Sequence, residues 1–227
     1  MSRNLLMICL VALLGWSTAL QAEPDAEQHK RPFTEGLEYQ LINPPVPTHN
    51  DDGRIEIVEL FLYACPHCNV LAPKMNEWAK DKSEYVVLQR VPAIVGAPWA
   101  DQARAYYTAE KLGILEKSHP ALFKSIHEDG EQYADDHSVM EFFVKQGVKK
   151  EDFIQAFRSP EVDENVSQAR ILTVKYGIRG VPAVIVNGKY RTAQYFTGTQ
   201  EKLLEVLDML VEKERNARND SLSKLEH

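Results

Sequence analysis

The segment FLYACPHCNVLAP, residues 61–73, contains two cysteines at a predicted boundary between a strand and a helix. The preceding apolar segment IEIVELFLY (55–63) is typical of a strand that is buried on both faces. A helix is predicted to begin at the cysteines and to run to about Lys82, with Pro73 inside it. Cys65 and Cys68 are therefore expected at the start of this helix.

A cysteine at a helix N-terminus is expected to ionise readily. The unpaired backbone N–H groups and the helix dipole stabilise a thiolate there, so Cys65 is predicted to be the more exposed and more acidic thiol. Pro66 suits the first helical position, because its missing N–H costs nothing at that point. His67 can donate a hydrogen bond or place positive charge near the Cys65 sulfur. Cys68, one turn further in, is expected to be buried and to resolve a mixed disulfide.

This chemistry also predicts a direction of electron flow. Whatever stabilises the Cys65 thiolate stabilises the reduced dithiol, and therefore makes the disulfide a stronger oxidant. The Cys65 thiolate is also a good leaving group in thiol–disulfide exchange. Pro66 and His67 therefore favour the donation of a disulfide over the reduction of one.

Two other uses of the cysteine pair are less favoured by the sequence. A zinc site needs four protein ligands, or three and a water molecule, and His67 is badly placed to chelate a metal together with both cysteines. His119, His127 and His137 show no tight ligand spacing, so neither a metal nor another cofactor is expected. A structural disulfide that closes so short a loop gains little from loop closure.

Two further positions are candidates for the site. Glu59 lies six residues before Cys65, inside the apolar strand, and could accept a proton from Cys68 through water during thiol–disulfide exchange. Its pKa is expected to rise if the side chain is buried, although the side chain could instead face solvent from the other face of the strand. A cis peptide at Val181-Pro182 would leave the preceding backbone free to pair with a substrate strand; an ordinary trans proline at a strand start is the alternative.

The N-terminal segment MSRNLLMICLVALLGWSTALQA (1–22) has the features of a secretory signal peptide. Cleavage is expected after Ala22 or Ala19, and Ala22 is preferred because an acidic, polar segment begins there. Export would place the cysteines in an oxidising compartment, where a lone dithiol can persist as a disulfide. The formal net charge of −7 gives no reason to expect nucleic acid as a partner, and it disfavours adsorption to an anionic membrane surface.

The remaining pattern divides the chain into strands, a helical block and more strands. Apolar strand signals precede the cysteines and return at YVVLQRV (85–91), whereas Pro98 to Gly177 shows helical periodicity only. Strands return with PAVIV (182–186) and a hairpin turn at Asn187-Gly188, before a last amphipathic helix. The predicted division is a signal peptide (1–22), a discontinuous α/β domain (23–97 and 178–216), a helical insertion (98–177) and a C-terminal tail (217–227).

With these residues in place, the chain resembles the thioredoxin superfamily, and within it the DsbA-type periplasmic thiol:disulfide oxidases. The features that carry the resemblance are ELFLYACPHC (59–68), the inserted helical block and GVPAVIVNGKY (180–190). They are spread over nearly all of the chain after the signal peptide. The residues Leu62-Tyr63-Ala64 are less aromatic than the family pattern. This departure bears on which substrates and partners the protein prefers, and not on the chemistry of the cysteines.

The resemblance implies a thioredoxin fold with an inserted α-helical domain, and it implies roles for individual residues. Cys65 would attack and link to the substrate, Cys68 would resolve the mixed disulfide, and His67 would set the oxidising power. Glu59 would be the buried acid, and Val181, before a cis Pro182, would contact the substrate. The expected partners are reduced, unfolded exported proteins and a DsbB-type, quinone-linked membrane oxidase; a monomer is the simplest expectation.

Other functions remain open at this point. A disulfide isomerase or reductase would use the same cysteines, but related isomerases carry a dimerisation module for which residues 23–54 are too short. A peptide-binding, chaperone-like module, in which the cysteine pair is incidental, is the alternative from a different class.

Overall fold

The structure is a computed structural model that describes residues 32–48, 50, 52–133 and 135–224. The predicted signal peptide and residues 23–31 lie outside the described residues. The described residues from Phe33 onward form one compact unit. Among the described residues, no helix has both the length and the apolar character needed to cross a membrane.

The strands of the described part form one mixed sheet in the order β1-β5-β4-β2-β3. The interior strand β2 pairs in parallel with β3 and antiparallel with β4, so the predicted parallel crossover through the cysteine-containing helix is confirmed. Every residue of β2 is buried, as its continuous apolar pattern predicts. The strands are β1 Tyr39–Leu41, β2 Ile55–Phe61, β3 Val86–Pro92, β4 Ala183–Val186 and β5 Tyr190–Ala193.

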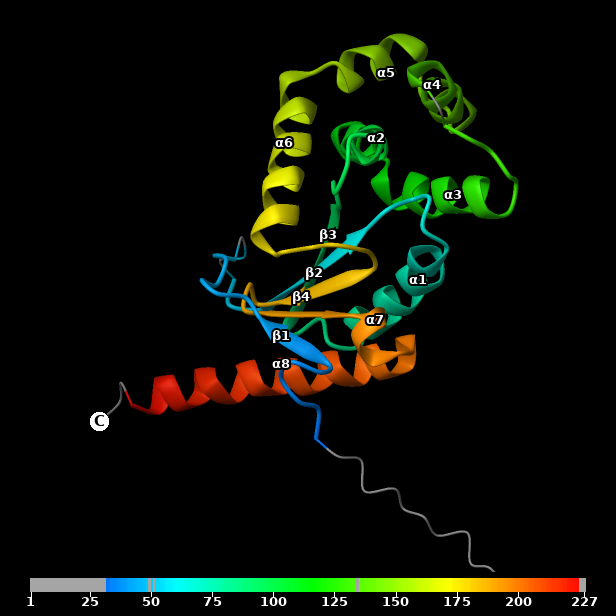
Figure 1. The fold of residues 1–227 in the computed structure, drawn as a ribbon. Coiled ribbons are helices and arrows are strands. Elements are labelled where there is room, and N and C mark those ends of the chain that lie inside the picture. Colours follow the sequence, from blue (N-terminus) through cyan, green and yellow to red (C-terminus); the bar gives the residue numbers. More distant parts are fainter. Residues whose placement is uncertain (1–31, 49, 51, 134, 225–227) are drawn as a thin grey trace, which may run out of the picture. The chain divides into compact units, whose positions relative to one another are not determined.

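Helices cover both faces of the sheet (Figure 1). On one face, Ile57 and Val184 pack with helices α1 and α8; on the other, Val58 and Ile185 pack with the helices α2 to α6. The helices are α1 Pro66–Lys80, α2 Trp99–Lys111, α3 Leu115–His127, α4 Asp136–Lys145, α5 Lys150–Phe157, α6 Pro160–Lys175, α7 Gln194–Thr197 and α8 Gln200–Ser223. Helices α2 to α6 lie within the range predicted as the insertion, and the division of the chain into two domains stays a prediction.

Three boundaries differ from the pattern in the sequence, each for a local reason. Ser118-His119-Pro120 is typical of a helix start, but α3 begins at Leu115, and the Ser118 hydroxyl donates to the Ile114 carbonyl at 2.9 Å instead of capping a helix. The segment KYRTAQY (189–195) predicts one strand, but β5 stops at Ala193, where its pairing with β4 ends, and α7 follows. Residues 217–223 belong to α8 and not to a tail: they contain no glycine or proline, and Arg218 donates to the Gly53 carbonyl.

The predicted Asn187-Gly188 turn joins β4 to β5, and both residues have positive φ, 50° and 65°. Val186 pairs with Tyr190, so the connection has three residues, and Asn and Gly are the residues that most readily adopt positive φ in such turns. A Cβ atom at Gly188 would overlap the carbonyl oxygen of Val46, whose N–H donates to the Gly188 carbonyl at 3.0 Å. Glycine is therefore required at this position both by backbone angle and by space.

We expect Gly188→Ala to lower the free energy of unfolding by roughly 2–4 kcal/mol, because strain at positive φ adds to the overlap with Val46. Gly113→Ala is the matched control: its φ of 69° is similar, but no atom lies within 4 Å of an added Cβ. Gly113→Ala should lower the free energy of unfolding by only about 1 kcal/mol. Urea unfolding of both variants measures the difference, and equal losses would contradict the role of Val46.

Candidate active site

The end of β2 and the start of α1 place the two cysteines. Cys65 is the N-cap residue of α1, and its Sγ accepts a hydrogen bond from the Cys68 N–H at 3.4 Å. Pro66 begins the helix, at a position where no N–H is needed. Cys65 is half-buried and Cys68 is fully buried, and both are free thiols. The strand, turn and helix thus present one sulfur outward and hold the other inside.

The two thiols have pKa values shifted in opposite directions. The pKa of Cys65 is lowered from 9.0 to about 6, chiefly by a hydrogen bond from the Cys68 thiol, with further contributions from the N–H groups of Cys68 and His67 and from the charge of His67. Burial raises the pKa of Cys68 strongly, and its pairing with Cys65 and the negative charge of Glu59 add to this increase. In the dithiol, the negative charge therefore resides on Cys65.

The peptide bond between Val181 and Pro182 is cis, and it lies beside Cys65. The Cys65 thiol donates to the Val181 carbonyl at 3.6 Å. The chain between Gly180 and Ala183 thus passes the outer sulfur with its backbone facing it. The structure brings these two predicted positions together although they are separated by more than a hundred residues in the sequence.

Glu59 is buried, with 1% of its surface exposed, so the alternative that it faces solvent is excluded. It lies opposite Arg90 in the parallel register, and Arg90 Nε donates to Glu59 Oε2 at 3.1 Å. Burial raises the pKa of Glu59, while the charge and hydrogen bond of Arg90 oppose this increase. Within the described residues, the buried Oε1 of Glu59 has no hydrogen-bond partner.

His67 has an exposed side chain, and its backbone carbonyl accepts a hydrogen bond from Gln200 Nε2 at 3.0 Å. This bond connects the first turn of α1 to the start of α8. His67 also borders a hollow of about 240 Å³ that is lined as well by Val181, Pro182, Gln194 and Tyr195. The predicted site residues thus surround Cys65, except Glu59, which lies beneath it in the sheet.

Several residues of the site were missed in the sequence. Arg90 is the partner of Glu59, and alignment of the two parallel strands in register could have found it, since it is the single charged residue of β3. Gln102 and His127 bind the backbone just before Cys65, at 2.9 and 2.7 Å. They lie on helices far along the chain, and no local pattern indicates them.

The described residues contain no group of three or more His, Cys, Asp or Glu side chains that could hold a metal ion. His119 is buried, and its Nδ1 is 2.9 Å from the hydroxyl of Tyr63. His127 uses its Nε2 to donate to the Tyr63 carbonyl. These two histidines thus contact one residue of the loop before the cysteines.

A Cys-x-x-Cys pair that opens a helix after a buried strand, with a cis proline beside the outer sulfur, defines a thiol:disulfide oxidoreductase of the thioredoxin class. A model of the "DSBA-like thioredoxin domain" family matches residues 84–207. The chain belongs to this family.

Curated relatives and solved structures agree with this assignment. The chain is 37% identical over 190 residues to the thiol:disulfide interchange protein DsbA of Pseudomonas syringae, covering 84% of this chain and 88% of that protein. It is 40% identical over 176 residues to the DsbA of Azotobacter vinelandii, covering 76% and 82%. The crystal structure of Pseudomonas aeruginosa DsbA superposes with a TM-score of 0.78 at 35% identity, over 82% of this chain and 97% of that one.

We expect the reduced protein to be alkylated by iodoacetamide at Cys65 with a pH midpoint of about 6. The thiolate is the reacting form, so the rate should rise as pH increases through this value. Mass spectrometry should locate the label on Cys65, and Cys65→Ser should remove the titration. A midpoint near 9 would contradict the stabilised thiolate.

The same pKa shift predicts a pH dependence of stability. The folded-state pKa of Cys65 lies below the ordinary value, so its contribution is fully present above about pH 9 and is lost as pH falls to about 6. The reduced protein should therefore lose stability, relative to the disulfide form, between pH 9 and pH 6. Urea unfolding of both forms across this range measures the difference.

We expect Arg90→Met to destabilise the protein by about 3 kcal/mol at pH 8, because it leaves Glu59 charged and buried without its partner. The loss should be smaller at pH 5: the pKa of Glu59 is raised further in the variant, and protonation then removes the charge. Arg90→Met combined with Glu59→Gln should recover much of the stability. Equal losses at both pH values would contradict a charged Glu59 as the cause.

Proposed function

We propose that the protein is a periplasmic thiol:disulfide oxidase that donates the Cys65–Cys68 disulfide to exported proteins. The observation that carries the proposal is the pair of opposite sulfur environments: a half-buried Cys65 with a pKa of about 6 at the N-terminus of α1, and a fully buried Cys68 with a raised pKa. Such a pair stabilises the dithiol, and therefore makes the disulfide oxidising. Membership in a family of thiol:disulfide interchange proteins supports it.

The reaction transfers one disulfide and two electrons. A substrate thiolate attacks Cys65 Sγ, the Cys65–Cys68 bond breaks, and Cys68 leaves and takes up a proton. A second substrate thiolate then attacks the substrate sulfur of the mixed disulfide and releases Cys65 as its stabilised thiolate. The substrate dithiol is oxidised to a disulfide, and the protein disulfide is reduced to a dithiol.

Glu59 is proposed to exchange the proton of Cys68. Burial raises the pKa of this carboxyl, and its charge contributes to the raised pKa of Cys68, so the two groups lie within electrostatic reach of each other. A protonated Glu59 could supply a proton through water when Cys68 leaves, and the carboxylate could take it back during reoxidation. Val181 is proposed to contact the substrate strand through its backbone.

The compartment and the partners follow from the sequence together with this chemistry. The predicted signal peptide and the oxidising role support a periplasmic location, where the proposed substrates are reduced, unfolded exported proteins. A dithiol must be reoxidised after each cycle, and a DsbB-type, quinone-linked membrane oxidase is the proposed electron acceptor. The reaction needs no bound cofactor, and it can be carried out by a monomer.

The equilibrium of the Cys65–Cys68 disulfide with glutathione, followed by tryptophan fluorescence, tests the proposal. Reduction should be strongly favoured, and the disulfide form should oxidise a reduced test protein, whereas Cys65→Ser should not. His67→Leu should raise the pKa of Cys65 and shift the equilibrium toward the disulfide by roughly tenfold.

His137→Leu is the matched control for His67→Leu, because His137 is an exposed histidine of α4 outside the site. It should leave the glutathione equilibrium unchanged. A disulfide that glutathione reduces no more readily than a thioredoxin disulfide would support a reductase or isomerase instead. Full activity of Cys65→Ser would support a peptide-binding module.

A further inference from the structure

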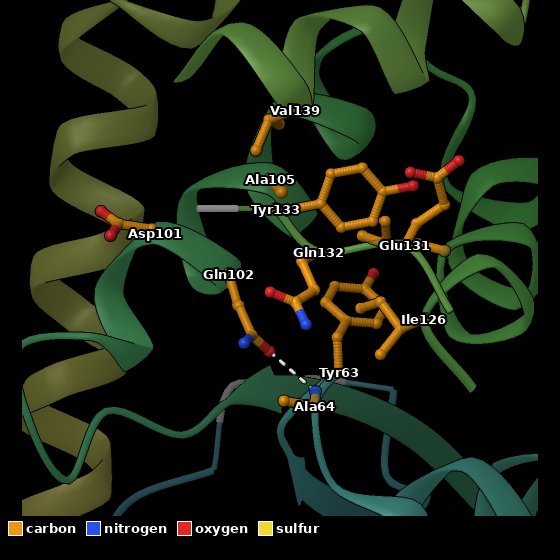
Figure 2. A pocket seen from close by; sticks show the side chains of 11 residues that line it. Tyr63, Ala64, Asp101, Gln102, Ala105, Ile126, Glu131, Gln132, Tyr133 and Val139 are labelled. Carbon is orange, nitrogen blue, oxygen red and sulfur yellow. Dashed lines mark hydrogen bonds between the residues drawn. The ribbon is translucent and has the colours of Figure 1, made fainter. Parts of the chain in front are cut away.

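A pocket of about 290 Å³ lies between the segment just before Cys65 and the helices α2, α3 and α4 (Figure 2). Its volume is at the lower limit of the roughly 300–1,000 Å³ that is typical of small-molecule sites, so it suits a single large side chain better than a whole ligand. Its apolar walls are formed by Tyr63, Ala105, Leu122, Ile126, Tyr133 and Val139.

The pocket is directly connected to the catalytic loop. Ala64, which precedes Cys65, lines it together with Tyr63. The peptide group that joins these two residues is held at both edges: its N–H donates to Gln102 Oε1 at 2.9 Å, and its carbonyl accepts from His127 Nε2 at 2.7 Å. Figure 2 shows the bond between Gln102 and Ala64 at the floor of the pocket. A side chain that enters the pocket therefore contacts the residue next to the reacting sulfur.

The pocket is distinct from the hollow at the cis proline. That hollow borders His67, after Cys65, whereas this pocket borders Ala64, before Cys65, and no residue lines both. A substrate whose cysteine sulfur reacts with Cys65, and whose backbone lies along Val181, would have two hollows beside it. The cis-proline hollow lies on the His67 side, and the present pocket lies on the Ala64 side. The two hollows can thus receive side chains from opposite sides of the substrate cysteine.

Acidic side chains surround the pocket. Asp101 and Glu131 line it, and in Figure 2 they lie on opposite sides. Glu128 and Asp129, both exposed, precede Glu131 in the chain. Lys145 approaches Glu131 only to 3.8 Å, with both side chains largely exposed, so this pair neutralises little of the charge. The surroundings are complementary to a cation next to an apolar group.

We propose that this pocket is a subsite for the polypeptide that is being oxidised. It takes one large apolar side chain of the substrate, such as Leu, Ile, Met or Phe, and a neighbouring Lys or Arg of the substrate pairs with Asp101 or Glu131. The proposal rests on the proposed function, because it assigns the substrate class of the same reaction.

The test uses the full-length mature protein in its disulfide form and synthetic peptides that contain one cysteine. Leucine or serine is placed in turn at each position around the cysteine, with lysine or glutamate next to it. Stopped-flow tryptophan fluorescence measures the rate of mixed-disulfide formation. We expect Leu with an adjacent Lys, on one side of the cysteine, to react roughly fivefold faster than Ser with Glu.

Three variants assign this preference to the pocket. Asp101→Lys with Glu131→Lys should abolish or invert the preference for lysine, and Gln132→Trp, an exposed position that lines the pocket, should abolish the preference for leucine. Glu151→Lys, which changes the charge of an exposed residue of α5 outside the pocket, is the control and should retain both preferences.

The outcomes separate the subsite from the function. Equal rates for all peptides, or preferences that persist in the variants, would overturn the subsite and leave the oxidase function standing. If no peptide reacts with the disulfide form, the proposed function fails, and the subsite fails with it.

Discussion

The unequal environment of two sulfur atoms, one helical turn apart, is the constraint on which the active site depends. Cys65 is the N-cap residue of α1 and receives hydrogen bonds there, whereas Cys68 is fully buried. The helix N-terminus stabilises negative charge at the first position, and desolvation opposes it at the second. A nucleophile therefore reaches only the outer sulfur, and the same sulfur later leaves as the more stable thiolate. The direction of the chemistry follows from this asymmetry.

The rest of the fold keeps this asymmetry in place. Strand β2 is buried along its whole length, so it requires helices on both faces of the sheet. On one face, α1 packs with α8, and the bond from Trp78 Nε1 to Asp208 at 2.9 Å joins the two helices. On the other face, the helices between β3 and β4 complete the core, and two of them hold the peptide group before Cys65 through Gln102 and His127. The helical block thus contributes to the core and to the position of the catalytic loop.

Sequence reasoning predicted those features that depend on local patterns. The buried strand, the cysteine-led helix and the turn at Asn187-Gly188 each carry their signal within a few residues. The contacts made by Arg90, Gln102 and His127 were not predicted, because each joins segments far apart in the chain. Burial of Glu59 was an open question in the sequence for a related reason. A strand pattern shows that successive side chains point to opposite faces of the sheet, but it does not show which face is covered by other elements. Helices on both faces of the sheet answer it: Glu59 is buried, and Arg90 lies opposite it in the parallel register.

The pairing of Glu59 with Arg90 bears on how the reaction can conserve charge inside the protein. When the disulfide is reduced, Cys68 acquires an electron pair within electrostatic reach of the buried Glu59 carboxyl. That carboxyl is already paired with Arg90. Two buried anions near a single guanidinium would leave one charge unpaired, which costs several kcal/mol. Reduction must therefore bring a proton to Cys68 or to Glu59. The charge and hydrogen bond of Arg90 oppose the desolvation of the Glu59 carboxylate, while burial keeps its pKa raised, and this balance supports the proposed exchange of that proton by Glu59.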